Sequence, residues 1–161
     1  MTKYEELLTK AEKEGINVLE INVGTSKKYG RYFDNVIVIN SNMTDIEKRE
    51  VLAEELGHHH TSHGNITDLN EIRNIKQELI ARRDSYKILV EPNNIVEAMR
   101  KGANNIYEIA EHVHVTVDTL HQIIDDFRKQ YGIGIQVGNY YLQFEPHFGI
   151  IQDFGGLVKY K

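Results

Sequence analysis

The sequence predicts an α+β fold, with a helical core, a small N-terminal sheet, a second group of helices and short C-terminal strands. Three observations indicate this class. Val- and Ile-rich segments separated by turn residues come before residue 41. Segments with helix-start signals and helical apolar spacing follow, up to about residue 131. After Gly132, alternating apolar and aromatic residues indicate strands again.

The N-terminal part is predicted to form one surface helix and two strands. Leu7, Leu8 and Ala11 lie among Glu and Lys, which predicts a helix over 3–14 that Gly15 ends. The segments Ile16–Val23 and Tyr32–Asn40 are rich in β-branched residues, so we expect two strands, arranged as a hairpin. Two segments interrupt the apolar pattern as turns do, namely 24–30 and the pair Asp34 and Asn35.

Two long helices are predicted next. Thr44 stands three residues before Glu47, which is the spacing of a capping box and predicts a helix over 45–59. Thr61–Asn65 is typical of a loop, and Asp68 with Glu71 indicates a second helix start. This helix is expected over 69–90, before Pro92. Its predicted buried stripe consists of Ile72, Ile75, Leu79, Tyr86 and Leu89.

The last 70 or so residues are predicted to be helical first and extended afterwards. Asn93 and Asn94 are candidate caps for a third helix. We expect helices over 95–101, 106–113 and 117–131, and strands over 133–137, 140–144 and 148–154. The predicted division is a core over 1–92, a helix-turn-helix-like segment over 93–131 and a C-terminal β segment over 132–161, packed as one compact unit.

Composition excludes several classes of protein. The chain of 161 residues is 40% apolar and 27% charged, and it has no cysteine. Disulfide scaffolds, cysteine-ligated metal centres and thiol nucleophiles are therefore excluded. A net charge of −5 argues against bulk binding of nucleic acid or anionic lipid. No apolar run approaches a membrane span, and the first residues do not resemble a signal peptide. We therefore expect a soluble, cytoplasmic protein without a membrane partner.

The segment Glu54-Glu55-Leu56-Gly57-His58 carries the chemistry that the sequence suggests. It matches H-E-x-x-H except at the first position, where Glu54 replaces His. Residues at i and i+4 share one helix face, so Glu54 and His58 are candidate ligands of one metal ion. Glu55 then takes the position of the general base. The alternative register, Glu55 with His59, leaves Leu56 in the position of the base.

A catalytic metal site needs a third protein ligand from another element. Glu78 on the next helix is the best candidate, because Ala81 one turn later lets the two helices approach closely. Weaker choices are Glu71, Gln77 and Asp84. Zinc is the expected cofactor, and a site with two carboxylates also suits manganese or another divalent ion. His59, His60 and His63 are further candidate ligands, and this His-rich run could also form a metal-binding module without hydrolysis.

The order of these features resembles the ImmA/IrrE family of metallopeptidases, in the versions found in phages and mobile elements. The resemblance rests on the E-E-L-G-H helix, on the helix that carries Glu78 and Ala81, and on the helical segment with Ala110 and Val115, and it extends over 37–151. It implies a zincin-like helical core beside a small sheet. It also implies that Glu55 is the general base, that His58 and Glu78 are metal ligands, and that the substrate is a helix-turn-helix repressor.

Residues 106–127 have the rhythm of a helix-turn-helix. Ala110, Leu120 and Ile123 are predicted to be buried, Thr116 to cap the second helix, and His114 to take the turn position usually held by Gly. The face expected to be exposed consists of Asp118, Thr119, Gln122, Asp125 and Asp126. Its acidic residues make DNA an unlikely partner. The alternative to a peptidase is a non-catalytic antirepressor that binds a repressor or DNA through this segment.

Overall fold

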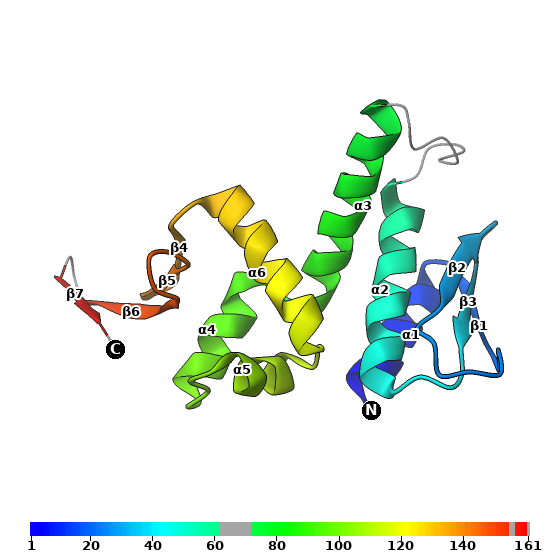
Figure 1. The fold of residues 1–161 in the computed structure, drawn as a ribbon, viewed down its shortest axis with the longest axis horizontal. Helices are drawn as coiled ribbons and strands as arrows, with labels where there is room; N and C mark the ends of the chain where they lie inside the picture. The colour runs from blue at the N-terminus through cyan, green and yellow to red at the C-terminus, as the bar shows by residue number, and fades with distance from the viewer. Residues whose placement is uncertain (62–71, 155–156, 161) are drawn as a thin grey trace. The chain divides into compact units, whose positions relative to one another are not determined.

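The fold was obtained as a computed structural model, which describes residues 1–61, 72–154 and 157–160. The chain forms two compact units, Met1–Leu89 and Val90–Lys161. The division lies close to the predicted boundary at residue 92, and the second unit contains both the helix-turn-helix-like segment and the C-terminal strands (Figure 1). Both helices and strands occur in each unit, so the predicted α+β class is confirmed.

The N-terminal unit has a three-stranded sheet, where the sequence predicted two strands. Helix α1 (Lys3–Lys13) precedes β1 (Asn17–Ile21), β2 (Gly30–Phe33) and β3 (Val36–Asn40). The strand order is β1-β3-β2, with β1 parallel to β3 and β2 antiparallel to it. The predicted strand over 32–40 is therefore two strands, and the expected hairpin between the first two segments is wrong. The hairpin is formed by β2 and β3.

The two residues between β2 and β3 explain this difference. Asp34 and Asn35 have φ values of 47° and 61°, so both adopt the left-handed conformation. Two consecutive left-handed residues are the mark of a tight hairpin turn, and Asp and Asn tolerate that conformation better than most residues. The turn residues had been recognised in the sequence, but they separate two paired strands within a segment that was predicted as one.

The loop over 22–29 is fixed to the sheet and to the next helix. The Asn40 side chain is fully buried, and its Nδ2 donates to the carbonyl oxygens of Thr25 at 2.9 Å and Lys27 at 2.7 Å. Lys28 Nζ contacts the buried carboxylate of Glu50 at 2.7 Å. A buried carboxylate of this kind is stable only with a charged partner. The loop that leads into β2 is therefore held at two places.

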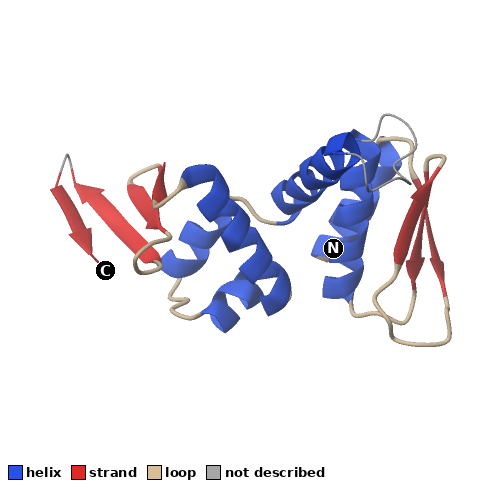
Figure 2. Cartoon of the chain, turned by 45° about the horizontal axis from the view of Figure 1, so that its top comes forward, coloured by secondary structure: helices blue, strands red, loops and turns tan. Residues whose placement is uncertain are grey.

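Helix α2 (Asp45–Thr61) begins where the capping box predicted. The Glu47 amide donates to Thr44 Oγ1 at 3.2 Å, and the Thr44 amide donates to the Glu47 carboxylate at 3.3 Å. Helix α2 ends two residues later than the predicted 59. Helices α1 and α2 pack on one face of the sheet, and α3 (Ile72–Leu89) packs against α2 (Figure 2). The predicted start of α3 at 69 lies outside the described residues.

The buried face of α3 differs from the predicted stripe. Ile75 and Leu79 are 47% and 56% exposed, although they were expected to be buried. Leu89 is buried as predicted, and Ala81 and Ser85, which were not part of the predicted stripe, are buried as well. The reason is a close approach at Gly57, where an added Cβ would overlap the carbonyl oxygen of Ala81 and touch the Ser85 side chain. Helices that approach this closely bury small side chains, so Ile75 and Leu79 lie outside the contact.

In the second unit, two predicted helices agree with the structure at both ends. Helix α5 (Ile106–Val113) and helix α6 (Val117–Tyr131) have the predicted bounds. Between them, His114 adopts the left-handed conformation with φ 57° and ψ 49°. Thr116 Oγ1 accepts from the Thr119 amide and so caps α6 as predicted. Leu120 and Ile123 are fully buried, as expected, but Thr119, which was expected on the exposed face, is 8% exposed and buried.

The other elements of this unit differ in their bounds. Helix α4 (Pro92–Arg100) begins at Pro92, because proline is favoured in the first turn of a helix and the Asn94 side chain accepts from the Glu91 amide. The prediction had started this helix at 95. The C-terminal sheet has the order β4-β5-β6-β7 and consists of β4 (Gly134–Val137), β5 (Tyr140–Gln143), β6 (Gly149–Phe154) and β7 (Leu157–Tyr160). The strand β7 was not predicted.

The close approach of α2 and α3 predicts an unusual response to a small substitution. Gly57→Ala removes a helix-weakening glycine, yet we expect it to lower the free energy of unfolding by about 1–3 kcal/mol, because the new methyl group overlaps the α3 backbone. Gly149→Ala is the matched control, since a Cβ there has no neighbour within 4 Å. Urea unfolding followed by circular dichroism measures both. Equal midpoints for the two variants would contradict the close approach.

Candidate metal and catalytic site

Helices α2 and α3 bring two of the predicted ligands together. His58 Nε2 lies 3.5 Å from Glu78 Oε1, and the two side chains are 22% and 34% exposed. His58 directly follows Gly57, so the close approach of the helices places it beside Glu78. The pair therefore presents one nitrogen and one carboxylate oxygen toward each other at a half-exposed position.

The spacing of this pair fits a metal ion. Two donors at about 2.0–2.2 Å from a tetrahedral zinc lie roughly 3.4 Å apart. The observed distance of 3.5 Å between His58 Nε2 and Glu78 Oε1 agrees with that value. Glu54 is exposed, and among the described residues no group of three His, Asp or Glu side chains has an arrangement that could hold a metal ion. The structure thus unites His58 and Glu78 but does not add Glu54 to them.

The predicted general base, Glu55, belongs to α2, and its side chain contacts β2. The Tyr32 backbone amide donates to the Glu55 carboxylate, and an added Cβ at Gly30 would lie 3.6 Å from Glu55 Oε1. The pKa of Glu55 is raised to about 7, chiefly by burial, and the negative charges of Glu54 and Glu78 contribute to the increase. The nearby His58 and the Tyr32 amide oppose this shift. Glu55 is therefore a half-buried carboxyl group beside the His58 and Glu78 pair.

Two other histidines of the run have structural contacts, His59 at one ring nitrogen and His60 at both. The His59 Nδ1 and the Tyr32 hydroxyl are hydrogen-bonded at 2.8 Å. Both nitrogens of His60 are occupied, Nδ1 by Asp84 at 2.7 Å and Nε2 by Glu14 at 2.7 Å. Asp84 is thus engaged by His60, and the alternative register of Glu55 with His59 directs its histidine toward β2. The candidates His63 and Glu71 lie outside the described residues.

Sequence reasoning missed Tyr32. This residue contacts the site twice, through its backbone amide at Glu55 and through its hydroxyl at His59. Its ring also meets the His59 ring edge-on, with centroids 5.3 Å apart. No motif or spacing marks Tyr32 as a site residue, since it is separated from Glu55 by more than twenty positions. Tyr32 reaches the site only because β2 packs against α2.

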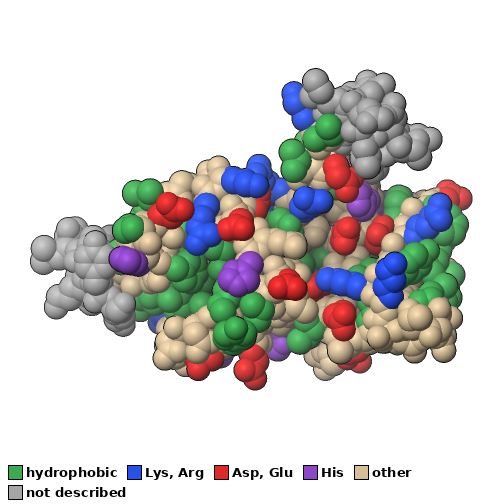
Figure 3. Space-filling model, viewed as in Figure 1, with side chains coloured by type: hydrophobic (Ala, Val, Ile, Leu, Met, Phe, Trp, Pro, Cys, Tyr) green, Lys and Arg blue, Asp and Glu red, His purple; other side chains and the backbone are tan. Residues whose placement is uncertain are grey.

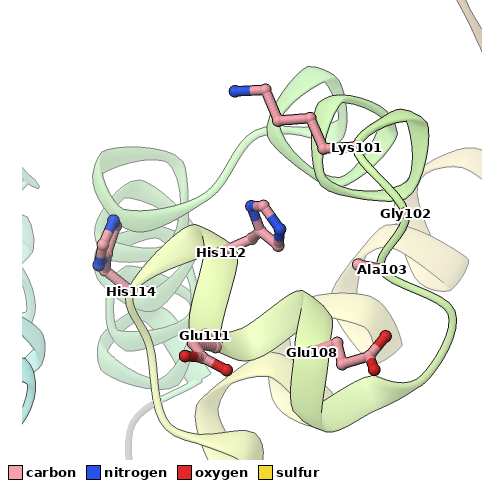
Figure 4. Close-up of a pocket in the computed structure, with 7 residues that line it drawn as sticks. All are labelled: Lys101, Gly102, Ala103, Glu108, Glu111, His112 and His114. Atoms are coloured by element: carbon pink, nitrogen blue, oxygen red, sulfur yellow. The ribbon is translucent and has the colours of Figure 1, made fainter.

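The second unit has a polar hollow of its own. It measures about 520 Å³ and is lined by the end of α4, the following loop and α5 (Figure 4). Its lining residues are Lys101, Gly102, Ala103, Glu108, Glu111, His112 and His114. The Glu108 carboxylate accepts from the Asn104 amide at 2.9 Å and so serves the start of α5. None of the predicted metal ligands or the predicted base lines this hollow.

Comparison with known families identifies the chain at the level of its family. The model of the IrrE N-terminal-like domain, Peptidase_M78, matches residues 11–124. The chain belongs to the IrrE N-terminal-like family. The match includes the whole candidate site and continues into α6. No curated protein and no solved structure matches the chain.

Membership of the IrrE N-terminal-like family confirms the predicted resemblance and assigns the chain to the metallopeptidase type. Glu55 and His58 on α2 and Glu78 on α3 all lie within the matched residues. Within the described parts of the chain, no helix combines the length and the apolar character that crossing a bilayer requires.

The contacts of His60 predict a pH-dependent stability. Burial lowers the pKa of His60, but its bonds with Asp84 and Glu14 outweigh this and raise it above 6.5. A raised pKa stabilises the folded state fully below pH 6.5, and this contribution is lost as the pH rises through the raised value. With EDTA present to remove metal ions, His60→Gln should therefore lower the free energy of unfolding by about 1 kcal/mol more at pH 5.5 than at pH 9.

Urea midpoints of the parent chain and the variant at both pH values measure this difference. His121→Gln is the matched control, because His121 is an exposed helical residue of the other unit. A larger loss of unfolding free energy at pH 9 than at pH 5.5 would show that the His60 imidazole is neutral when it contacts Asp84 and Glu14.

Proposed function

We propose that this chain is a metal-dependent endopeptidase that cleaves a helix-turn-helix repressor of a phage or mobile element. The observation that carries the proposal is the 3.5 Å contact between His58 Nε2 and Glu78 Oε1, with the Glu55 carboxyl group beside it. Family membership supports a metallopeptidase type of chemistry. We further propose that the protein acts in the cytoplasm, where its substrate would be found.

In this proposal Glu54, His58 and Glu78 hold a divalent ion, with zinc as the first choice and manganese as the alternative. Glu54 stands one helical turn before His58, so its exposed side chain has to turn toward the His58 and Glu78 pair. A bound ion would polarise the scissile carbonyl and acidify a water molecule. Glu55 takes the proton of the attacking water and delivers it to the leaving amine. The Tyr32 amide holds the Glu55 carboxylate in position for both transfers.

The partner is proposed from the family and from the surface of α6. Asp118, Gln122 and Asp125 are exposed on this helix, in the position where a DNA reader would need Arg or Lys. Such a surface suits the basic DNA-reading face of a repressor and steers the encounter at low salt. Cleavage is expected at an extended, exposed segment, because a peptide must present its backbone to the site without competing hydrogen bonds.

A second candidate function is a non-catalytic antirepressor. It is favoured by one observation, that among the residues described no group of three His, Asp or Glu side chains could hold a metal ion. In that case the same acidic α6 surface would bind the repressor without cleaving it.

Glu55→Gln separates these two functions. The substitution removes the base but keeps the shape of the side chain. We therefore expect cleavage of the repressor that is encoded beside this protein to fall at least about 100-fold. Association with the repressor should persist and should weaken as salt rises. Gel analysis of fragments and fluorescence anisotropy of labelled repressor measure the two properties.

Asp118→Asn is the matched control, because it should weaken association without removing the base. Association without fragments under every metal condition, for both the parent chain and Glu55→Gln, would support the antirepressor. Binding to bare DNA with no affinity for the repressor would contradict both functions.

Glu54→His tests the ligand set. It restores the two-histidine motif, and imidazole suits zinc better than a carboxylate does. We therefore expect the zinc affinity of the untagged chain to rise roughly tenfold or more, measured by competition with a chromophoric chelator. Glu97→His, an exposed helical position in the other unit, is the control. Equal zinc affinity for the parent chain and Glu54→His would show that Glu54 is not a ligand.

A further inference from the structure

One face of the N-terminal sheet is apolar and open to solvent. Side chains alternate between the two faces of a strand, and the face toward α1 and α2 contains the fully buried Ile37 and Ile39. On the opposite face, Leu19 and Ile21 are each 44% exposed and Phe33 is 53% exposed. These three residues are large and hydrophobic, and they belong to both edge strands of the sheet.

The strand register makes this face continuous. Leu19 of β1 is opposite Val38 of β3, and Val38 is opposite Arg31 of β2. In the next row, Val36 of β3 is opposite Phe33 of β2. Val36 and Val38 are half-buried, while their neighbours on the edge strands are exposed. We call this set the open sheet face, consisting of Leu19, Ile21, Arg31, Phe33, Val36 and Val38.

No described helix of this unit covers the open sheet face, because α1 and α2 both pack on the other side (Figure 2). At one end of this face, the loop that contains Thr25 and Lys27 lies against the buried Asn40, which is opposite Ile21. Hydrophobic side chains and Lys or Arg side chains lie next to each other along the sheet-bearing rim in Figure 3. Apolar patches of this kind on a folded chain mark interaction sites more often than single exposed residues do.

The charge of the open sheet face is positive. Arg31 is its one charged member, and no described residue forms an ion pair with the Arg31 guanidinium. Lys27 stands in the loop that leads into β2 and is also exposed, and its ammonium group has no ion pair with a described residue. Lys28 next to it is neutralised by Glu50. A partner that covers this face must therefore supply apolar side chains and at least one carboxylate.

The sheet geometry selects the form of the partner. The backbone groups of a sheet bond in its plane, so its face offers only side chains to an incoming segment. The segment has to satisfy its own backbone, which a helix does and an extended peptide does not. A second copy of this chain fits poorly, because the same face of that copy would add a second Arg31 and no carboxylate to pair with it.

We propose that the open sheet face binds an acidic amphipathic helix of a partner protein. The apolar stripe of this helix packs on Leu19, Phe33 and the valines between them. Its Asp or Glu side chains meet Arg31 and Lys27. This binding is independent of the metal and of Glu55, so it holds whether or not the chain is a peptidase.

The probe is a pair of synthetic helical peptides of about 18 residues. Both carry the same Leu stripe at helical spacing, one with flanking Glu and the other with flanking Lys. Fluorescence anisotropy on the full chain should show the Glu peptide binding at least about fivefold more tightly at low salt, since exposed ion pairs contribute modestly. Backbone amide shifts on the full chain should map the contact to β1, β2 and β3.

Two variants and one control test the assignment. Arg31→Glu should reverse the preference, so that the Lys peptide binds more tightly. Phe33→Ser should weaken binding of the Glu peptide at least about tenfold. Ile133→Ser is the matched control, since Ile133 is also a large exposed apolar residue, 68% exposed, but belongs to the other unit. It should leave binding of both peptides unchanged.

Several results would overturn the proposal. Equal binding of the two peptides, or a preference that Arg31→Glu does not change, would remove the role of the charge. Absence of binding, or amide shifts confined to the second unit, would remove the site. A concentration-dependent dimer in sedimentation that Phe33→Ser abolishes would assign the face to a second copy of the chain.

Discussion

The contact of α2 with α3 at Gly57 is the constraint on which the rest of the N-terminal unit depends. Because residue 57 has no side chain, the α3 backbone at Ala81 can lie directly against α2. His58 is the next residue, and the approach that Gly57 permits leaves it 3.5 Å from Glu78. The proposed metal donors, His58 and Glu78, thus lie together because Gly57 has no Cβ and lets the two helix backbones approach closely.

Local signals in the sequence were sufficient to predict where several helices begin or end, but they were insufficient to predict which strands pair. The bonds between Thr44 and Glu47 involve residues three apart, so the start of α2 could be predicted from spacing alone. The bounds of α5 and α6 were predictable for the same reason, with Thr116 as the cap. The parallel pairing of β1 with β3 joins residues almost twenty positions apart, and no local pattern distinguishes it from a hairpin.

The candidate site shows the same limit at the scale of side chains. The motif and the expected approach of two helices were enough to predict that His58 and Glu78 lie together, but the structure does not bring Glu54 to this pair. The motif was not enough to sort the histidines, because the contacts of His59 and His60 come from β2, α1 and α3. Helical periodicity also failed on α3, where it favoured large apolar residues and the actual contact uses Ala81 and Ser85.

The buried amide of Asn40 has a consequence for how the site meets a ligand. Its Nδ2 group gives both of its hydrogens to the loop carbonyls of Thr25 and Lys27, and an aspartate of the same shape has none to give. The loop before β2 is therefore ordered when the chain folds. The strand that holds Glu55 through the Tyr32 amide starts from this anchored loop. Binding of a peptide then does not have to order that strand. The conformational entropy of the strand is lost when the chain folds and does not weaken the binding of each peptide.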